Sequence, residues 1–322
     1  EAVPGYGVLL HAQVNAAGEG APIVLMGHMD TVFPAGTVAK RPYREEAGRA
    51  YGPGVADMKS GLVLNVFVAE AFARCGGLKA PLHLFFSCDE EIGSPATRDL
   101  IMDRVRGARA VFNAEPGRVS GNVVTSRKGS MLVEFEVEGV AAHAGINHAA
   151  GASAIDALAR KTLALHALTD PATGVTANVG VVHGGVVSNM VAPHARAELD
   201  LRFTADTNPE DLLARVRAII EEESVPRTQG RITVARSTLP MKPTPDYLLA
   251  LYQESARTLG FEVQGEFTGG AADSGLTASV GVPTLCATGP VGGHPHTERE
   301  YCELTTFVPR AQAVALAVLR HP

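Results

Sequence analysis

Three short motifs carry side chains of the types that bind catalytic metal ions. His28 and Asp30 lie two residues apart, Asp57 stands in a glycine-containing segment, and Glu90 and Glu91 are adjacent. A hydrolytic site with two cations roughly 3.5–4 Å apart needs imidazole and carboxylate ligands together with a further carboxylate that moves protons. The motifs therefore predict metal-assisted hydrolysis, provided that folding brings them together.

Each motif also has a simpler interpretation. In a strand, His28 and Asp30 would share one face, where the carboxylate either fixes the tautomer of a ligating imidazole or makes only a local polar contact. Asp57 precedes a predicted helix and is either a bridging ligand or the helix N-cap. Glu90 and Glu91 follow an apolar strand, where adjacent carboxylates are costly unless they are paired or bind a cation. A solvated acidic loop is the alternative.

Two further regions add candidates. Glu115 follows another apolar strand pattern and is either a ligand or a turn residue. His294 and His296 lie in a glycine-containing loop, where one of them is a candidate ligand. His143 falls in the middle of the chain, away from these motifs, and is not expected to be a ligand. Five or six ligand-type residues at strand ends within one domain are unexpected by chance.

The elements that position these residues alternate along the first part of the chain. Apolar segments of strand length alternate with helical patterns: strands over 23–33, 82–88 and 109–114, helices over 58–75 and 95–106. This order predicts a mostly parallel α/β sheet covered by helices, with its site beyond the carboxyl ends of the strands. His28, Glu90 and Glu115 all follow such an end. The helix over 58–75 is apolar on most faces, so we expect it to be largely buried.

The pattern changes near residue 120 and returns near residue 237. The middle part predicts strand–helix–strand–strand–helix–strand: 131–139, 152–168, two strands within 176–203, a helix from Asn208-Pro209 and a final strand. That order is typical of an open-faced, ferredoxin-like α+β sandwich. The last part predicts a helix at 245–259, a glycine-rich loop at 269–275, a strand at 283–287 and a helix near 306–320. We therefore divide the chain into 1–118, an inserted 119–230, and 231–322.

Composition limits the class of protein. The 322 residues are 46% apolar and 19% charged, with a net charge of −6 and no Lys/Arg run. These values favour a globular protein over one that binds nucleic acid or anionic membranes, and no apolar run approaches the ~20 residues of a membrane span. Four scattered cysteines suggest reduced thiols. We expect a cytoplasmic protein; a periplasmic or secreted one is the alternative, because the chain opens as though earlier residues were missing.

Four segments resemble the dinuclear-zinc aminoacylase/carboxypeptidase family: 28–32 (HMDTV), 51–61 (YGPGVADMKSG), 89–94 (DEEIGS) and 142–145 (AHAG). The resemblance covers nearly the whole chain. The family includes acetylornithine deacetylase, succinyl-diaminopimelate desuccinylase and bacterial glutamate carboxypeptidase. Residues 39–44, 93–94 and 98–101 resemble the glutamate carboxypeptidase branch most. The resemblance implies a zinc-exopeptidase-like sheet, with the inserted sandwich serving as a dimerisation domain.

The resemblance also implies a ligand for each metal position. Asp57 would bridge two zinc ions in each subunit, with Co²⁺ or Mn²⁺ as substitutes. His28 and Glu115 would complete one position, and Glu91 and His296 the other. His296 is favoured of the two loop histidines because a Ser/Thr and an acidic residue follow it, as in the family. A glutamate at 115 fits the deacylase and carboxypeptidase branches better than the aminopeptidase branch.

Five further residues receive roles from the same resemblance. Glu90 would be the general base and Asp30 the partner that orients His28. His143 would reach from one subunit into the site of the other and stabilise the oxyanion. Asn189 and Arg202 would hold the carboxylate of the substrate, for which the planar fork of an arginine is well suited.

Three functions compete on this basis. The first is a zinc carboxypeptidase that releases a C-terminal amino acid, with glutamate as the expected product. The second is an N-acyl-amino-acid deacylase, similar to acetylornithine deacetylase, that uses the same chemistry on a different pocket. The third is a non-catalytic, metal-stabilised binding protein, which the complete set of ligands and base disfavours. In the first two cases the expected partners are a small peptide or N-acyl amino acid and a second copy of the chain.

Overall fold

The computed structural model describes residues 1–322, and the contacts within it divide the chain into two compact units. The first unit is Glu1–Arg127 together with Met241–Pro322, and the second is Lys128–Pro240. Both boundaries lie later than the expected 118/119 and 230/231. The reason is that β9 (Val123–Arg127) pairs within the sheet of the first unit, whereas β13 (Gln229–Thr238) pairs within that of the second.

A mixed sheet forms the centre of the first unit. Besides β9 it contains β3 (Leu10–Val14), β4 (Ile23–His28), β7 (Leu82–Ser87), β8 (Ala110–Asn113), β14 (Gly265–Thr268) and β15 (Thr284–Cys286). The order across the sheet is β14-β9-β15-β8-β4-β7-β3. Strand β4 runs parallel to both of its neighbours, and only β3 and the β15–β9 pair are antiparallel. The predicted mostly parallel sheet is therefore confirmed.

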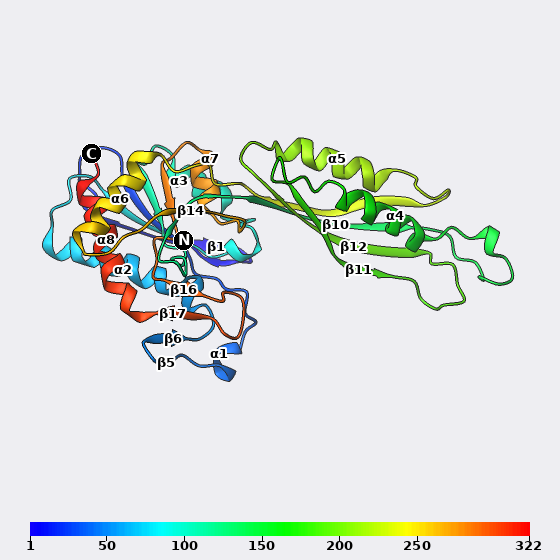
Figure 1. Cartoon of the computed structure of the whole chain (residues 1–322), viewed down its shortest axis with the longest axis horizontal. Coiled ribbons are helices and arrows are strands. Elements are labelled where there is room, and N and C mark those ends of the chain that lie inside the picture. The colour runs from blue at the N-terminus through cyan, green and yellow to red at the C-terminus, as the bar shows by residue number, and fades with distance from the viewer. The chain divides into compact units, whose positions relative to one another are not determined.

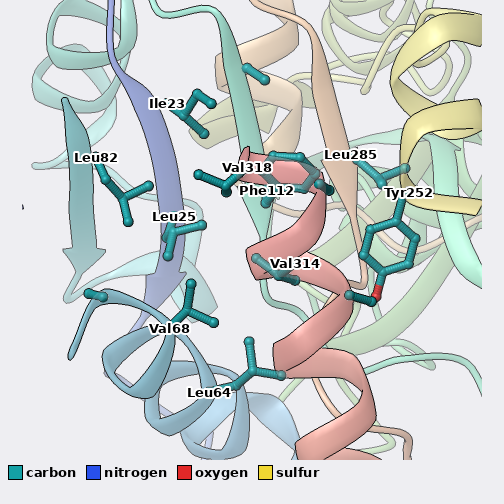
Figure 2. Close-up of a cluster of buried hydrophobic side chains, with 14 of the residues drawn as sticks. Ile23, Leu25, Leu64, Val68, Leu82, Phe112, Tyr252, Leu285, Val314 and Val318 are labelled. Carbon is teal, nitrogen blue, oxygen red and sulfur yellow. The ribbon is translucent and has the colours of Figure 1, made fainter. Parts of the chain in front are cut away.

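Helices cover this sheet and build the main core. They are α2 (Ser60–Cys75), α3 (Arg98–Val105), α6 (Asp246–Thr258), α7 (Ser274–Ser279) and α8 (Phe307–Arg320). Every residue of β4 is buried, as expected for a parallel strand that is covered on both faces. Figure 2 shows Val314 and Val318 of α8 in one cluster with Leu25 and Phe112 of the sheet. Complete burial of each such side chain contributes about 1.5–3 kcal/mol.

The expectation that the helix over 58–75 is largely buried was wrong. Leu64 and Val68 of α2 lie in the core, but Val66 and Phe67 are 47% and 61% exposed. Only one face of α2 packs against the strands and α8. Its apolar composition exceeds what that single face can bury.

The first unit also contains a second, small sheet, which brings together two loops that are distant in the sequence. It contains β5 (Arg44–Glu46), β6 (Arg49–Tyr51), β16 (Gly292–Gly293) and β17 (Tyr301–Glu303), in the order β16-β17-β6-β5. The antiparallel pairing of β6 with β17 joins parts of the chain about 250 residues apart, with Tyr51 opposite Tyr301. The segment 52–57 and the loop 294–300 therefore start from neighbouring strands. The short elements β1 (Ala2–Val3), β2 (Gly7–Val8) and α1 (Thr37–Lys40) complete the first unit.

The second unit is an antiparallel sheet with two helices. Its elements are β10 (Gly129–Glu138), α4 (Ala154–His166), β11 (Thr176–Gly184), β12 (His194–Phe203), α5 (Pro209–Glu221) and β13, and the sheet order is β11-β12-β10-β13. Figure 1 shows α4 and α5 beside these strands. Alternate residues of β10, such as Val133 and Phe135, are buried in the core that the helices cover. Asn208 caps α5 by accepting the Glu210 N–H, with Pro209 at the first helical position. None of the helices in either unit is long and apolar enough to cross a membrane.

Candidate metal centre

Three adjacent strands bring the strand-end candidates together. His28 is the last residue of β4, Glu90 and Glu91 lie in a 3-10 turn (Glu90–Ile92) after β7, and Glu115 follows β8 by two residues. Strands β7, β4 and β8 are parallel neighbours, so their carboxyl ends meet at one edge of the sheet. The side chains converge there because sheet order, and not sequence distance, sets their separation.

Asp57 lies between the two histidines of this cluster. Its Oδ1 is 3.1 Å from His28 Nε2, and its Oδ2 is 3.2 Å from His296 Nε2. Asp57 comes from the segment that follows β6, where the Asp57–Met58 peptide is cis, and His296 comes from the loop before β17. Each oxygen of one carboxylate therefore faces a different imidazole. This is the arrangement that a carboxylate shared by two cations requires.

The remaining carboxylates divide between the same two histidines. Glu91 Oε2 lies 3.3 Å from His296 Nε2, whereas Glu115 Oε1 lies 3.8 Å and Glu90 Oε2 3.9 Å from His28 Nε2. Ligand atoms of His28, Asp57 and Glu91 all lie within 4.8 Å of one another. His28 is buried, while the side chain of His296 is 51% exposed. One half of the cluster therefore opens toward solvent.

Asp30 contacts the other nitrogen of the His28 ring. His28 Nδ1 lies 3.1 Å from the main-chain oxygen of Asp30 and 3.4 Å from its Oδ1. The Asp30 Oδ2 atom accepts the backbone N–H of Glu91 at 2.9 Å. A proton on Nδ1 satisfies these acceptors and leaves the Nε2 lone pair directed at the carboxylate cluster, which fixes the imidazole tautomer that a metal ligand needs.

The clustered carboxylates shift the pKa values of one another. Burial raises the pKa of Glu90 well above its usual range, and the neighbouring carboxylates of Glu115 and Asp273 add to the rise. Burial and the charge of Asp57 raise the pKa of Glu115 to about 7. Burial also disfavours ionisation of Asp57, but its contacts with His28 and His296 hold its pKa well below the usual range.

Both histidines respond in the opposite sense. Burial disfavours the charged His28 ring, yet the surrounding carboxylates, led by Glu90, raise its pKa well above the usual value. Hydrogen bonds to Asp57 and Glu91 raise the pKa of His296 to about 10. Without a metal ion, protons must therefore balance the charge of the clustered carboxylates. A bound cation would displace those protons, as is general for metal sites.

The donor set fits metal ions. Two imidazoles and several carboxylates are the oxygen and nitrogen ligands that zinc takes in catalytic sites. Glu91 Oε1 is a buried oxygen with no hydrogen-bond partner, and such an atom is costly unless a cation or a donor meets it. The cluster therefore offers the ligand types that metal ions take, and Asp57 presents one oxygen to each of its two histidines.

Sequence reasoning missed three buried carboxylates that support the site. Asp273 accepts hydrogen bonds from Ser87 at 2.9 Å and from Ser94, on either side of the turn that carries Glu90 and Glu91. Burial raises the pKa of Asp273 to about 6. Asp89 accepts the N–H of Ala96 at 2.7 Å and the hydroxyl of Thr97. The third is Glu300, whose side chain accepts hydrogen bonds from three backbone N–H groups. The partners of Asp273 and Glu300 come from distant parts of the chain, so no local pattern marks these two residues.

The remaining candidates make contacts of their own. The ring of His294 packs edge-on against Tyr301, with centroids 6.0 Å apart. His143, Asn189 and Arg202 belong to the second unit. Within that unit the N–H of Ala144, next to His143, donates to the Asn189 carbonyl at 2.9 Å, so the loops that carry His143 and Asn189 are neighbours.

Arg127 is a buried arginine at the end of β9, whereas most arginines in proteins are exposed. Its Nε donates to Cys286 Sγ at 3.3 Å and its Nη1 to the Gly270 carbonyl at 3.1 Å. Its charge helps to offset that of Glu115. Arg127 is thus a buried guanidinium that acts on the carboxylate cluster.

Comparisons with known proteins agree with this geometry. The sequence profile of Peptidase family M20/M25/M40 matches residues 24–320. Carboxypeptidase G2 from Pseudomonas sp. (strain RS-16) is 28% identical over 309 residues, which cover 93% of this chain and 74% of that protein. Succinyl-diaminopimelate desuccinylase from Burkholderia lata is 29% identical over 309 residues, with 89% and 79% covered.

Solved structures share the fold. An M20 family metallo-carboxypeptidase from Sulfolobus solfataricus superposes with a TM-score of 0.80 at 17% identity, over 98% of this chain and 88% of that one. A Bacillus subtilis protein described as a dinuclear metal binding peptidase superposes with a TM-score of 0.67 at 14% identity, over 98% and 86%. At such low identity these likenesses establish the architecture alone.

Proposed function

The chain belongs to Peptidase family M20/M25/M40, and from this premise we propose that it is a zinc-dependent carboxypeptidase. It hydrolyses an amide bond and releases a C-terminal amino acid, with glutamate as the expected product. The observation that carries the hydrolytic part is the Asp57 carboxylate, whose two oxygens face His28 and His296 at 3.1 and 3.2 Å. The likeness to carboxypeptidase G2 over 93% of the chain supports the carboxypeptidase part.

Two zinc ions per subunit complete the proposed site. His28 and Glu115 would hold one, Glu91 and His296 would hold the other, and Asp57 would contribute an oxygen to each. Cobalt or manganese can substitute, since their ligand preferences overlap with those of zinc. When bound, the ions supply Lewis acidity, which lowers the pKa of a water molecule and polarises the amide carbonyl. Asp30 keeps the His28 ring in the ligating tautomer.

Glu90 moves the proton in the proposed reaction. It lies beside His28 and makes no hydrogen bond of its own in the cluster, and burial raises its pKa. A carboxylate with a raised pKa can accept a proton from the attacking water and then deliver it to the leaving amine. Its neighbour Glu91 faces His296 instead, so the two adjacent glutamates are suited to different tasks.

His143 is the proposed donor to the developing oxyanion, supplied by the partner subunit. Its Nδ1 accepts the backbone N–H groups of Gly145 at 3.1 Å and Ile146 at 3.2 Å. A neutral ring that accepts at Nδ1 carries its proton on Nε2. The loop therefore prepares His143 to donate from Nε2 to a carbonyl oxygen as negative charge develops there.

Asn189 and Arg202 are the proposed anchors for the carboxylate of the substrate. Asp200 already accepts from Arg202 Nε at 2.8 Å and from Nη2 at 2.9 Å. This side-on pair fixes the plane of the guanidinium and leaves the Nη1 hydrogens and one Nη2 hydrogen on its end. A substrate carboxylate can accept hydrogen bonds from Nη1 and Nη2 of Arg202 while Asp200 keeps its hydrogen bonds from Nε and Nη2.

The second unit is the proposed dimerisation domain. Strand β11 forms one edge of its sheet, with no strand of this chain on its outer side. Val182 on β11 and Leu163 on α4 are exposed apolar side chains. An exposed edge strand is a template for pairing with another chain, and two-fold dimers are the commonest oligomers.

The expected cytoplasmic location stays a prediction.

A panel of substrates tests the function. Zinc-loaded protein is incubated with benzoyl-glutamate, dipeptides and N-acetyl amino acids, with and without a chelator, and the free amino acid is measured. The account predicts chelator-sensitive cleavage that favours a C-terminal glutamate. Preference for a small acyl group on a basic or apolar amino acid would move the protein to the deacylases, the second candidate, which the likeness to the desuccinylase supports. No cleavage of any amide by metal-loaded dimer would contradict both.

A further inference from the structure

Glu300 is a buried carboxylate that binds the segment carrying Asp57. Its side chain is 0% exposed. Oε2 accepts the N–H of Gly54 at 3.0 Å, and Oε1 accepts the N–H groups of Ala56 at 2.9 Å and Asp57 at 3.0 Å. Three backbone N–H groups from one short segment of the chain therefore converge on the carboxylate of Glu300. Hydrogen bonds to an ionised carboxylate are roughly twice as strong as neutral ones.

The position of Glu300 in the fold links two parts of the site. It directly precedes β17, and its own N–H donates to the Thr297 carbonyl at 3.3 Å, next to His296. The segment that it binds follows β6, the partner strand of β17. Glu300 thus fastens the segment that carries Asp57 to the loop that carries His296, across the β6–β17 pair.

A carboxylate suits this position better than any neutral side chain. A buried carboxylate is costly unless hydrogen bonds satisfy it, and here backbone N–H groups supply them without a paired cation. Lys59 interacts electrostatically with Glu300, but its Nζ donates its hydrogen bond to the Pro53 carbonyl at 3.2 Å. Gly54 adopts a left-handed φ of +72°, and a Cβ there would lie 2.5 Å from Thr31 Cγ2. The turn that aims these donors at Glu300 therefore requires glycine.

We propose that Glu300 is a positioning residue for the metal centre. It holds the backbone of Asp57 so that one carboxylate oxygen faces His28 and the other faces His296. It also sets the distance between the segment that carries Asp57 and the loop that carries His296. Glu300 itself is not a ligand, because both of its oxygens are occupied by backbone donors. The inference rests on the proposed function only in requiring that the cluster binds two metal ions.

Substitution of Glu300 tests this role. Glu300→Gln keeps the size of the side chain but replaces one oxygen acceptor by an amide nitrogen, which cannot accept a hydrogen bond. The side chain therefore loses one or more of its hydrogen bonds to the segment that carries Asp57. We expect retention of the second metal ion, the one assigned to Glu91 and His296, to weaken by about 10–100-fold, the range typical for an outer partner of a metal ligand. The readout is metal content by elemental analysis after dialysis against graded chelator. In addition, kcat should fall with little change in KM.

A matched control and a second variant make the result decisive. Glu303 is the last residue of β17, three residues after Glu300, and it pairs with Arg49 at 2.8 Å, so Glu303→Gln should retain both ions. Glu300→Asp keeps the charge but shortens the side chain by one methylene, so it should also lose the second ion first. This variant tests the role of Glu300 if Glu300→Gln does not fold. Wild-type metal retention in a folded Glu300 variant, or equal loss in the Glu303 control, would overturn the inference. A wild-type protein that binds no metal would instead contradict the proposed function.

Discussion

Replacing Glu90 by glutamine is expected to lower kcat by about 10²–10⁴-fold, the usual contribution of a general acid–base group, while the metal content stays at the wild-type value. Glutamine keeps the size of the side chain but cannot accept or deliver a proton. Glu90 is the more distant carboxylate from His28, at 3.9 Å, and is assigned to neither metal position. The measurements are the steady-state rate on the best substrate of the panel and metal content by elemental analysis.

The neighbouring residue provides the control for Glu90→Gln. Glu91 Oε2 lies 3.3 Å from His296 Nε2, so Glu91→Gln should reduce metal content as well as the rate. Two adjacent glutamates are then distinguished by metal retention alone. Near-normal turnover in Glu90→Gln would refute its role as the proton carrier. Loss of metal in that variant would assign Glu90 to the ligands instead.

Replacing Asp57 by asparagine is expected to remove both metal ions. Asparagine presents one oxygen and one amide nitrogen, so it cannot offer an anionic oxygen to each of two cations. Because Asp57 faces both histidines, its loss should weaken both positions together and lower metal affinity by about 100-fold or more, beyond the effect of an outer partner. Activity at micromolar zinc should fall to background.

Thermal unfolding with and without zinc measures the same loss without reference to activity. A ligand that binds only the folded state stabilises it by about 2.7 kcal/mol at one hundred times its dissociation constant. The wild-type midpoint should therefore rise with added zinc, and the midpoint of Asp57→Asn should not. If the variant kept the wild-type rise, or lost one ion and held the other unchanged, Asp57 would not be the shared ligand.

The strand-end part of the site could be predicted because it follows from a general property of parallel sheets. His28, Glu90, Glu91 and Glu115 each follow an apolar strand pattern, and β7, β4 and β8 are neighbours in the sheet. Chain order alone does not show that the strands are adjacent, but carboxyl ends in a parallel sheet share an edge whatever the order. Asp57 and His296 follow no strand pattern; their residue types made them candidates, and the resemblance to a known family assigned their ligand roles.

Residues whose role depends on long-range pairing could not be predicted. Glu300 meets the segment at 54–57 only because β6 pairs with β17, and each of these strands has three residues. Asp273 lies 186 residues after Ser87 and 179 residues after Ser94, yet it accepts hydrogen bonds from both. Neither contact leaves a periodic or local signal in the sequence, so only the folded chain reveals them.

Residue type was also a poor guide to burial in two places. The pattern of α2 suggested a helix buried on most faces, yet Val66 and Phe67 are exposed. Arg127 has the residue type of a surface position but lies buried at the end of β9. In each case the number of faces that neighbouring elements cover decides burial, and that number is a property of the tertiary structure.

The central claim is that this cluster holds two metal ions that share Asp57. The most direct measurement is anomalous X-ray diffraction at the zinc absorption edge from crystals of zinc-loaded protein. The account predicts two anomalous peaks, one on each side of the Asp57 carboxylate, the first next to His28 and Glu115 and the second next to Glu91 and His296. A single peak, or peaks away from Asp57, would contradict it.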